Sequence, residues 1–498
     1  MAPSSPAFPS PLVIGTSAPL YPTSILCVVL SVVAVLLAGC SVGPRYNRPV
    51  ANLQPYHNAP AIESRTAALP TPSLDTWWTG FNDAELTSII ERALAQNLDL
   101  AAAFARVQQA RAAAREASAN RKPEFDLAGS DSAARQSIAT PIGRAVSGVI
   151  PGFNLNQNIL DLGIGATWET DIFGSLRHGS EAANAEAQAA EAQRLGIRVS
   201  VAAEAADTYL QIRGAQVRRA FANEQIATDE HLLKLVLQRR DAGVASDREV
   251  AQAEALLSRA KATVPQLNII LEAQLNRLDV LMGVQPGTYA AALSAPRDIP
   301  AVPGIAKSLD TADLLRRRPD IIAAERRVAA SNARIGQALA EYYPKLSLSA
   351  LLGSAAETPA SLFRGAGFQP AAIAGLRWRL FDFGRIDAEV KRARGANAEA
   401  LALFRSSVLR AAEDVEDSFS ALVQAESQRG ELVREIDFLQ RAKDLSQQSY
   451  EAGVIPLTDV LDADNQLLIA KDELASTRQN AARAAVGSFR ALGGGWTP

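Results

Sequence analysis

The residue types that carry most enzyme chemistry are sparse in this sequence. Its 498 residues include three His, at positions 57, 178 and 231, which are scattered along the chain, so each is expected at the surface. The glycines at 493–495 follow a predicted helix and lack the Lys of a phosphate-binding loop, so they predict a helix cap. We therefore expect no enzyme activity, no metal site and no bound cofactor.

Cys40 is the exception, because its context predicts a covalent modification. Residues 25–38 form an apolar run of 14 residues, which is short for a membrane-spanning helix and typical of a signal-peptide core. The run leads into Leu37-Ala38-Gly39-Cys40, which resembles the bacterial lipobox, in which the Cys becomes the lipidated first residue of the mature protein. Residues 1–39 contain no Lys or Arg, so the usual positive segment of a signal peptide is missing.

We therefore expect a lipoprotein signal peptide over residues 1–39 and a covalent lipid on Cys40, which would be the only thiol of the mature chain. Ser41 follows, where an Asp commonly retains such lipoproteins at the inner membrane, so the outer membrane is favoured. The alternative is an uncleaved signal anchor with a buried Cys40.

Composition and charge favour a helical protein without a nucleic-acid partner. Hydrophobic residues make up 48% of the chain, charged residues 21%, and the formal net charge is −3, with no basic stripe. Abundant Ala, together with Gln, Glu and Arg, predicts long helices that pack closely.

Long helices would position the remaining candidate residues. A proline-rich, extended tether is expected over 40–75. Apolar residues then recur at helical spacing over 84–121, 175–240, 246–283, 311–342, 385–450 and 457–490. A helix of ~65 residues extends about 100 Å, which indicates a coiled-coil-like bundle instead of an ordinary globular domain.

The second half of the sequence repeats the first. Asp99 and Pro123 match Asp320 and Pro344, which lie 221 residues further along the chain. A second set of matches lies 210 residues apart and pairs Trp168, Phe173, Gly243, Val244 and Val250 with Trp378, Phe383, Gly453, Val454 and Val460. A duplication with a longer loop in the first half explains both offsets. We therefore expect a first repeat over 76–290, a linker over 291–310 and a second repeat over 311–498.

Each repeat contains a hairpin in which the apolar period changes to simple alternation, at about 123–172 and about 344–383. Leu160, Ile164 and Trp168, for example, alternate with small or charged residues such as Asp161 and Glu169. Strands of ~10 residues with one apolar face fit tilted crossings of a membrane barrel. Because four strands leave open edges that lipid cannot satisfy, several protomers would have to complete the barrel. The alternative is two half-buried hairpins on a soluble helical bundle.

The mature chain, roughly 40–498, closely resembles the TolC-type outer-membrane factors, specifically the NodT-like lipoprotein branch that serves efflux pumps. The resemblance rests on ordered motifs that include Trp77-Trp78, Asn97-Leu98-Asp99-Leu100, Arg317-Arg318-Pro319-Asp320-Ile321 and the C-terminal Ala491-Leu492-Gly493-Gly494-Gly495-Trp496. It implies a mainly α-helical homotrimer in which each protomer gives four strands to a 12-stranded membrane β-barrel and its helices to a long periplasmic α-helical barrel.

The resemblance also implies a periplasmic gate just beyond the second inter-helix tip. Asp462 occupies the position of the family's acidic ring, and Asp459 lies one helical turn earlier on nearly the same face. Many relatives have Arg where this chain has Asn465, and a bulky apolar residue where it has Thr458. The alternative reading of Asp462 is a solvated helix residue.

The two tips themselves are the expected contacts for a periplasmic adaptor protein. Each has a Gly that permits the turn and a Val that offers an apolar point, namely Gly243 with Val244 and Gly453 with Val454. The resemblance predicts an outer-membrane duct that carries small molecules from the adaptor and from an inner-membrane pump of the RND type. The alternatives are the duct of a type I protein secretion system and a structural coiled-coil lipoprotein.

Overall fold

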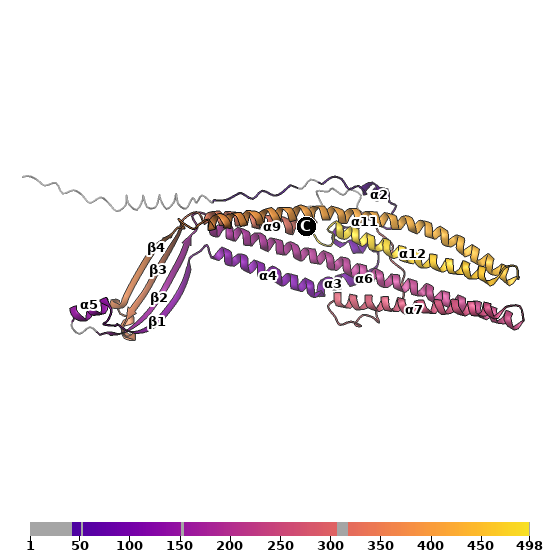
Figure 1. Ribbon diagram of the computed structural model, residues 1–498, viewed down its shortest axis with the longest axis horizontal. Helices are drawn as coiled ribbons and strands as arrows, with labels where there is room; N and C mark the ends of the chain where they lie inside the picture. Colours follow the sequence, from indigo (N-terminus) through magenta and orange to yellow (C-terminus); the bar gives the residue numbers. More distant parts are fainter. Residues whose placement is uncertain (1–41, 51–52, 151–153, 306–316, 498) are drawn as a thin grey trace, which may run out of the picture. The chain divides into compact units, whose positions relative to one another are not determined.

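The computed structural model describes residues 42–50, 53–150, 154–305 and 317–497 (Figure 1). The predicted signal peptide and Cys40 lie outside the described residues. The described chain divides into two compact units that are each discontinuous in sequence. Residues 120–178 and 336–386 belong to a strand-containing unit, and residues 44–119, 179–335 and 387–497 belong to a helical unit.

The strand-containing unit holds one antiparallel sheet. Its strands, in the order β1-β2-β3-β4, are Glu124–Arg135, Asn156–Thr170, Lys345–Ala356 and Phe368–Arg377. The central β2–β3 pairing joins the two sequence repeats, with Thr170 opposite Leu346. β1 and β4 are the two edges, and neither pairs with a further strand among the described residues.

β4 ends at Arg377, earlier than the alternating pattern predicted. It ends there because its partner β3 begins at Lys345, which lies opposite Arg377. Beyond that point the Trp378 indole N–H donates to the carbonyl of Tyr342 at 2.9 Å. The matching Trp168 donates to the carbonyl of Arg121 at 3.1 Å. The two repeats therefore share this tertiary contact as well as their sequence pattern.

The longer loop predicted in the first repeat contains a helix. α5, Pro141–Val149, lies between β1 and β2, and Thr140 caps it by accepting a hydrogen bond from the Gly143 N–H. The corresponding loop of the second repeat holds only the short α10, Pro359–Leu362, and the turn η2, Gly365–Gly367.

The helical unit contains the long elements. α6 (Ser175–Asp241) and α11 (Arg385–Glu451) each have 67 residues, and α7 (Asp247–Leu281) and α12 (Leu457–Ala491) each have 35. The first residues of α6 and α11 belong to the strand-containing unit. The shorter elements are α2 (Ala59–Ser64), η1 (Leu74–Phe81), α3 (Ala84–Gln96), α4 (Leu98–Ala119) and α9 (Pro319–Ala340).

A single helix over 84–121 was expected, but the chain breaks at Asn97, between α3 and α4. Asn97 is buried in an extended conformation. Its side-chain oxygen accepts from the Leu100 N–H at 3.0 Å, and its amide donates to the carbonyl of Leu281 at 3.0 Å. The residue thus caps α4 and satisfies the end of α7, which a local sequence pattern does not reveal.

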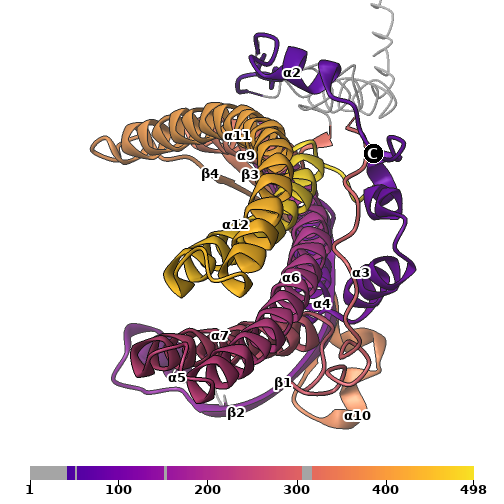
Figure 2. The same ribbon diagram turned by 90° about the vertical axis from the view of Figure 1, so that its right-hand side faces the viewer.

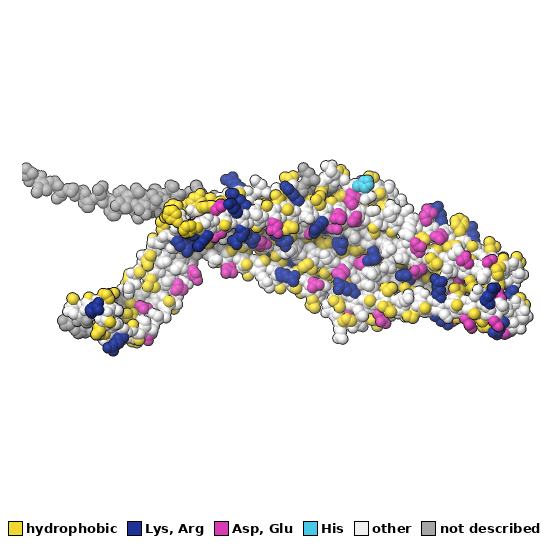
Figure 3. Space-filling view, viewed as in Figure 1, with side chains coloured by type: hydrophobic (Ala, Val, Ile, Leu, Met, Phe, Trp, Pro, Cys, Tyr) yellow, Lys and Arg dark blue, Asp and Glu magenta, His cyan; other side chains and the backbone are white. Residues whose placement is uncertain are grey.

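Within the helical unit, α6, α7, α11 and α12 form a curved wall, and α3 lies on its convex side (Figure 2). The main hydrophobic core lies on this convex side, between α3 and the wall (Figure 2). It includes Trp77, which stacks on Phe489 with ring centroids 5.4 Å apart, and Tyr209 of α6. Charged side chains of both signs are interspersed over the helical surface (Figure 3).

His178 differs from the expected surface position, because it is buried in the strand-containing unit. Its Nε2 lies 3.1 Å from the carbonyl of Val42, and its ring fills the space beside Gly336. His57 and His231 are exposed, as predicted. Across the described ranges, no helix has both the length and the apolar character needed to cross a membrane.

Candidate functional site

The two tips of the helical unit have the same backbone geometry. Gly243 and Gly453 both have a φ of +74°, a left-handed conformation that a side chain would strain. The Val244 N–H donates to the carbonyl of Arg239 and the Val454 N–H donates to that of Ser449, five residues back in each case. Each long helix therefore ends in a Schellman motif.

The valines that follow these glycines point away from the unit's core. Val244 is 64% exposed and Val454 is 76% exposed. A Cβ added to Gly243 or Gly453 would meet no atom within 4 Å, so only the backbone conformation requires glycine there. The structure thus places both tip pairs at the surface, where a partner could reach them.

The two tips contact one another. Arg239 of α6 donates from Nη1 to the carbonyls of Tyr450 and Glu451, at 3.1 and 3.3 Å. Its guanidinium also lies 4.5 Å from the centroid of the Tyr450 ring. Because the carbonyls at a helix end lack partners within the helix, Arg239 caps α11 and ties the second tip to the first. Sequence reasoning did not identify this contact.

Asp459 and Asp462 lie on the exposed face of α12, directly after the second tip. Leu457, Val460 and Leu467 form the opposite, buried face. The carboxylate of Asp462 accepts from the Gln466 amide at 2.7 Å, and Asp459 has only a 3.4 Å contact with the Thr458 hydroxyl. Neither carboxylate has a cationic partner among the described residues. Both charges therefore face solvent in the single protomer.

Asn465 follows Asp462 by one helical turn and is half-buried. The three predicted gate residues thus lie within two turns of the same helix. The helix after the first tip has a different N-terminal cap, because Glu249 there accepts hydrogen bonds from the N–H and the hydroxyl of Ser246, at 2.7 and 3.1 Å. That arrangement is a capping box, and α12 has Pro456 at the equivalent position without any side-chain cap.

A buried polar cluster lies close to the gate residues and was not predicted. Asp464 of α12 is 2% exposed and forms an ion pair with Lys443 of α11. Gln225 of α6 donates to both Asp464 and Asp229. Burial, with a contribution from the charge of Asp464, raises the pKa of Asp229 to about 6. The cluster therefore joins α6, α11 and α12 through polar side chains. No sequence pattern predicts that these side chains pair.

No group of three or more His, Cys, Asp or Glu side chains is placed to hold a metal ion in the described part of the chain. The predicted lipidation site, Cys40, falls outside that part, so its surroundings are not described. The candidate site therefore consists of the two tips and the first turns of α12.

Comparison with known proteins identifies relatives over almost the whole chain. The profile of the family described as outer membrane efflux protein matches residues 89–284 and 311–494. The chain is 33% identical to the pyoverdine export outer membrane protein OpmQ of Pseudomonas aeruginosa over 420 residues, which cover 84% of this chain and 87% of that protein. It is 28% identical to the outer membrane protein OprJ of the same species, over 93% of this chain and 95% of OprJ.

Solved structures agree with this result. The fold matches the outer-membrane channel OprN with a TM-score of 0.84 and 32% identity, over 92% of this chain and 100% of that one. It also matches the open state of the MtrE outer membrane channel of Neisseria gonorrhoeae, with a TM-score of 0.76 and 25% identity, over 92% of this chain and 99% of that one.

Proposed function

This chain belongs to the outer membrane efflux protein family, and we propose that three copies of Asp459 and Asp462 form the constriction of its channel. The protein is the outer-membrane channel of a tripartite efflux system and works with a periplasmic adaptor and an inner-membrane pump. It is a TolC-like homotrimer, in which each four-stranded sheet contributes to a shared membrane barrel and the helices extend into the periplasm.

The trimer resolves the open edges of the sheet. Edge strands β1 and β4 carry backbone groups that lipid cannot satisfy, and pairing each edge with a neighbouring protomer removes that cost. A closed barrel of three such sheets has no free edge. The fold of one protomer is therefore one third of a membrane structure.

The observation that carries the gate proposal is the solvent-facing pair of acids on α12. The two charges are one helical turn apart and have no cationic partner within the described protomer. When three copies approach around a narrow aperture, like charges raise the free energy of the closed ring and attract cations. The aperture is thus selective for charge and sensitive to what contacts the tips.

Transport through this channel is passive and involves no catalysis by the chain itself. Energy comes from the inner-membrane pump, and the channel supplies a water-filled path. OpmQ is named for the export of pyoverdine, a role that supports small molecules as the cargo here. A type I protein secretion duct remains the second candidate on fold alone.

Single-channel recording of the purified trimer tests the gate. Asp462→Ala should raise conductance and lower cation selectivity, because a charged and bulkier side chain leaves the constriction. Gln252→Ala is the matched control, since Gln252 is the equivalent residue of the first repeat. Unchanged conductance in Asp462→Ala, or an equal change in both variants, would remove Asp462 from the gate.

The lipid anchor is a separate part of the proposal and rests on the lipobox-like sequence before Cys40. Cells grown with labelled palmitate should yield labelled wild-type protein and unlabelled Cys40→Ser protein. Persistent labelling of the Cys40→Ser variant would contradict lipidation at this residue.

The tips are proposed as the adaptor contacts because both valines are exposed at the turn. Val244→Asp and Val454→Asp should each weaken cross-linking to the cognate adaptor without changing trimer yield, since a charge at an apolar contact is costly to desolvate. Val433→Asp, at an exposed valine within α11 and away from the tips, is the control. Equal cross-linking in all variants would exclude the tips as contacts.

A further inference from the structure

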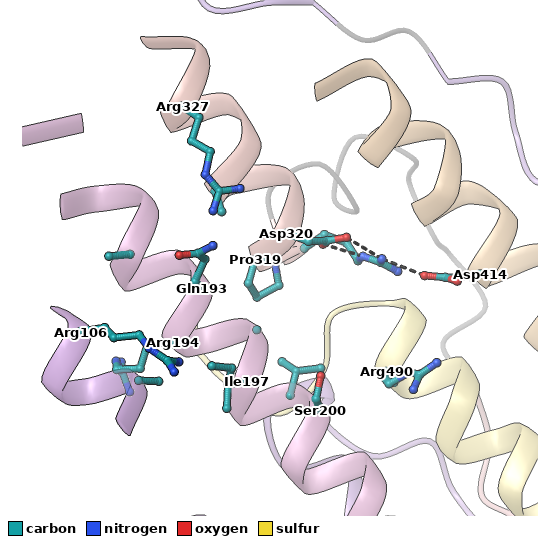
Figure 4. Close-up of a pocket in the computed structure, with 16 residues that line it drawn as sticks. Arg106, Gln193, Arg194, Ile197, Ser200, Pro319, Asp320, Arg327, Asp414 and Arg490 are labelled. Carbon is teal, nitrogen blue, oxygen red and sulfur yellow. Dashed lines mark hydrogen bonds and ion pairs between the residues drawn. The ribbon is translucent and has the colours of Figure 1, made fainter. Parts of the chain in front are cut away.

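A second charged region lies away from the tips, in the helical unit. A cavity of about 710 Å³ is bounded by α4, α6, α9, α11 and α12 (Figure 4). Four of its lining side chains are Arg106, Arg194, Arg327 and Arg490, which come from α4, α6, α9 and α12. Figure 4 shows Arg106 on α4 and Arg194 on α6 among the residues that line the cavity.

The carboxylates that line the cavity do not neutralise these arginines. Asp320 and Asp414 both pair with a fifth arginine, Arg318, at 2.7 and 2.8 Å. Arg194 pairs with Glu191 at 2.7 Å, outside the lining. Because these two acids share one arginine, they leave one negative charge, and the five arginines and two aspartates of the lining together carry a net charge of +3.

The other three arginines have no such partner. No ion pair or side-chain hydrogen bond of Arg106, Arg327 or Arg490 is found among the residues that the structure describes. Nearby, burial and the charge of Arg194 lower the pKa of Arg198. Positive charges that share a cavity repel one another unless an anion compensates them. The cavity therefore has a positive potential that favours a negatively charged ligand.

The cavity opens on the concave side of the helical wall. On α6 it is lined by Gln193, Ile197 and Ser200, whereas Ala202 and Tyr209 of the same helix lie in the core. At 3.6 residues per turn these two sets fall on opposite faces of the helix. Because the core lies toward α3, which is on the convex side of the wall in Figure 2, this lining face of α6 is turned toward the concave side.

We propose that this cavity is an anion-binding site on the inner wall of the channel, and that it takes small molecules with two or more carboxylate or phosphate groups. The proposal rests on the channel function, because only a ring of protomers makes the concave side an interior. Guanidinium groups bind both anion types through paired N–H donors, and four of them suit a multivalent ligand. The volume lies within the range of drug-sized binding sites.

The repeat contributes to the site directly. Arg106 and Arg327 are equivalent residues of the two repeats, 221 positions apart, and both line the same cavity. Arg194 and Arg490 have no arginine at the corresponding position of the other repeat, where Phe404 and Val280 stand. The duplication thus supplied two of the charges and later divergence supplied the others.

Binding of pyrophosphate to the purified, detergent-solubilised trimer tests the proposal by titration calorimetry. We expect wild-type binding that weakens at least tenfold in Arg106→Gln/Arg327→Gln. The matched control is Arg259→Gln/Arg429→Gln, which removes the same charge from exposed arginines outside the cavity. Absence of wild-type binding, or equal weakening in both double variants, would overturn the proposal.

Single-channel recording with pyrophosphate separates this site from the channel function. Block of the wild-type current that is relieved in the cavity variant and retained in the control supports an anion site on the conducting path. Block that is identical in all three proteins would overturn it. A trimer that binds pyrophosphate but conducts no ions would instead contradict the proposed channel function and leave the anion site standing.

A phosphorylated lipid headgroup is the other source of the same chemistry. Phosphate analysis of the extracted trimer distinguishes the two sources, since phospholipid retained by the wild type and control but lost by the cavity variant assigns the site to lipid. Equal phospholipid content with variant-sensitive pyrophosphate binding assigns it to a soluble anion.

Discussion

The tips of the two repeats have the same turn but use their acidic residues differently. Both long helices end in a left-handed glycine with the same hydrogen-bond pattern. At the first tip, Glu249 caps α7 by accepting hydrogen bonds from Ser246, and at the second tip its equivalent Asp459 faces solvent. Duplication preserved the turn, but Pro456 stands where the first repeat has the capping Ser246, so the second tip has no capping box.

The same contrast continues one turn further along each helix. Glu254 of the first repeat is exposed, whereas its equivalent Asp464 is buried and paired with Lys443. The position that matches Lys443 in the first repeat is Leu233. Both tips therefore have exposed acids, but among the described residues only the second has a buried ion pair behind them. The following predictions test this difference.

The largest effect is expected from Lys443→Met. Removing the cation leaves the buried carboxylate of Asp464 beside Asp229 without compensation, which should cost about 3–5 kcal/mol of unfolding free energy. Chemical denaturation of the trimer, followed by circular dichroism, measures it. The double variant Lys443→Met/Asp464→Leu should recover most of the loss, and a Lys443→Met protein as stable as the wild type would contradict the anchor.

Gly243→Ala and Gly453→Ala should each reduce stability by about 1–2 kcal/mol, because alanine is strained in a left-handed conformation. The two losses should be similar, since the turns share a φ of +74° and both lack neighbours around the added methyl group. Thermal unfolding of both variants checks this equality. A clearly larger loss at one tip would mean that the turns differ more than their geometry indicates.

Glu249→Ala should lower stability by about 1 kcal/mol, because it removes the capping box of α7. Asp459→Ala should have almost no effect on stability, since Asp459 makes only a 3.4 Å contact with Thr458. Denaturation of the two variants side by side measures the difference. Equal losses would show that Asp459 caps its helix after all.

A pH effect on the order of 1 kcal/mol is expected from Asp229. Its pKa is raised to about 6 in the folded protein, above the usual value near 4 of an unfolded Asp. The folded state therefore binds the proton more tightly, so unfolding free energy should increase as pH falls from 7 to 5 and be lost as pH rises through 6. In Asp229→Asn the gain in stability at low pH, measured as the rise in melting temperature between pH 7 and pH 5, should disappear. A pH dependence equal to that of the wild type would contradict the raised pKa of Asp229.

Local pattern was sufficient to predict the long helices and the strands. Proline-free stretches and apolar spacing located α6 and α11 to within a residue or two, and alternation located the hairpins. The break at Asn97 was missed because its cause is a hydrogen bond to Leu281, 184 residues away. The burial of His178 was missed for the same reason, since its neighbours Val42 and Gly336 are distant in sequence.

The site was predicted only where it is local. Glycine spacing and the acidic turn of α12 are visible in the sequence, and the structure places them at exposed tips. The Asp464–Lys443 pair joins two separate helices and the four cavity arginines come from four, so no spacing rule connects their members. The match of Arg106 with Arg327 between repeats was the one available signal for the cavity.

The equal lengths of the paired helices have a consequence for symmetry. α6 and α11 have 67 residues each, and α7 and α12 have 35 each, so both tips of a protomer stand at matching levels. Three protomers then present six tips with nearly sixfold backbone geometry. The acidic residue after the turn alternates around that ring, with Glu249 at three tips and Asp459 at the other three. A partner built from six identical subunits would therefore meet two chemical environments in alternation.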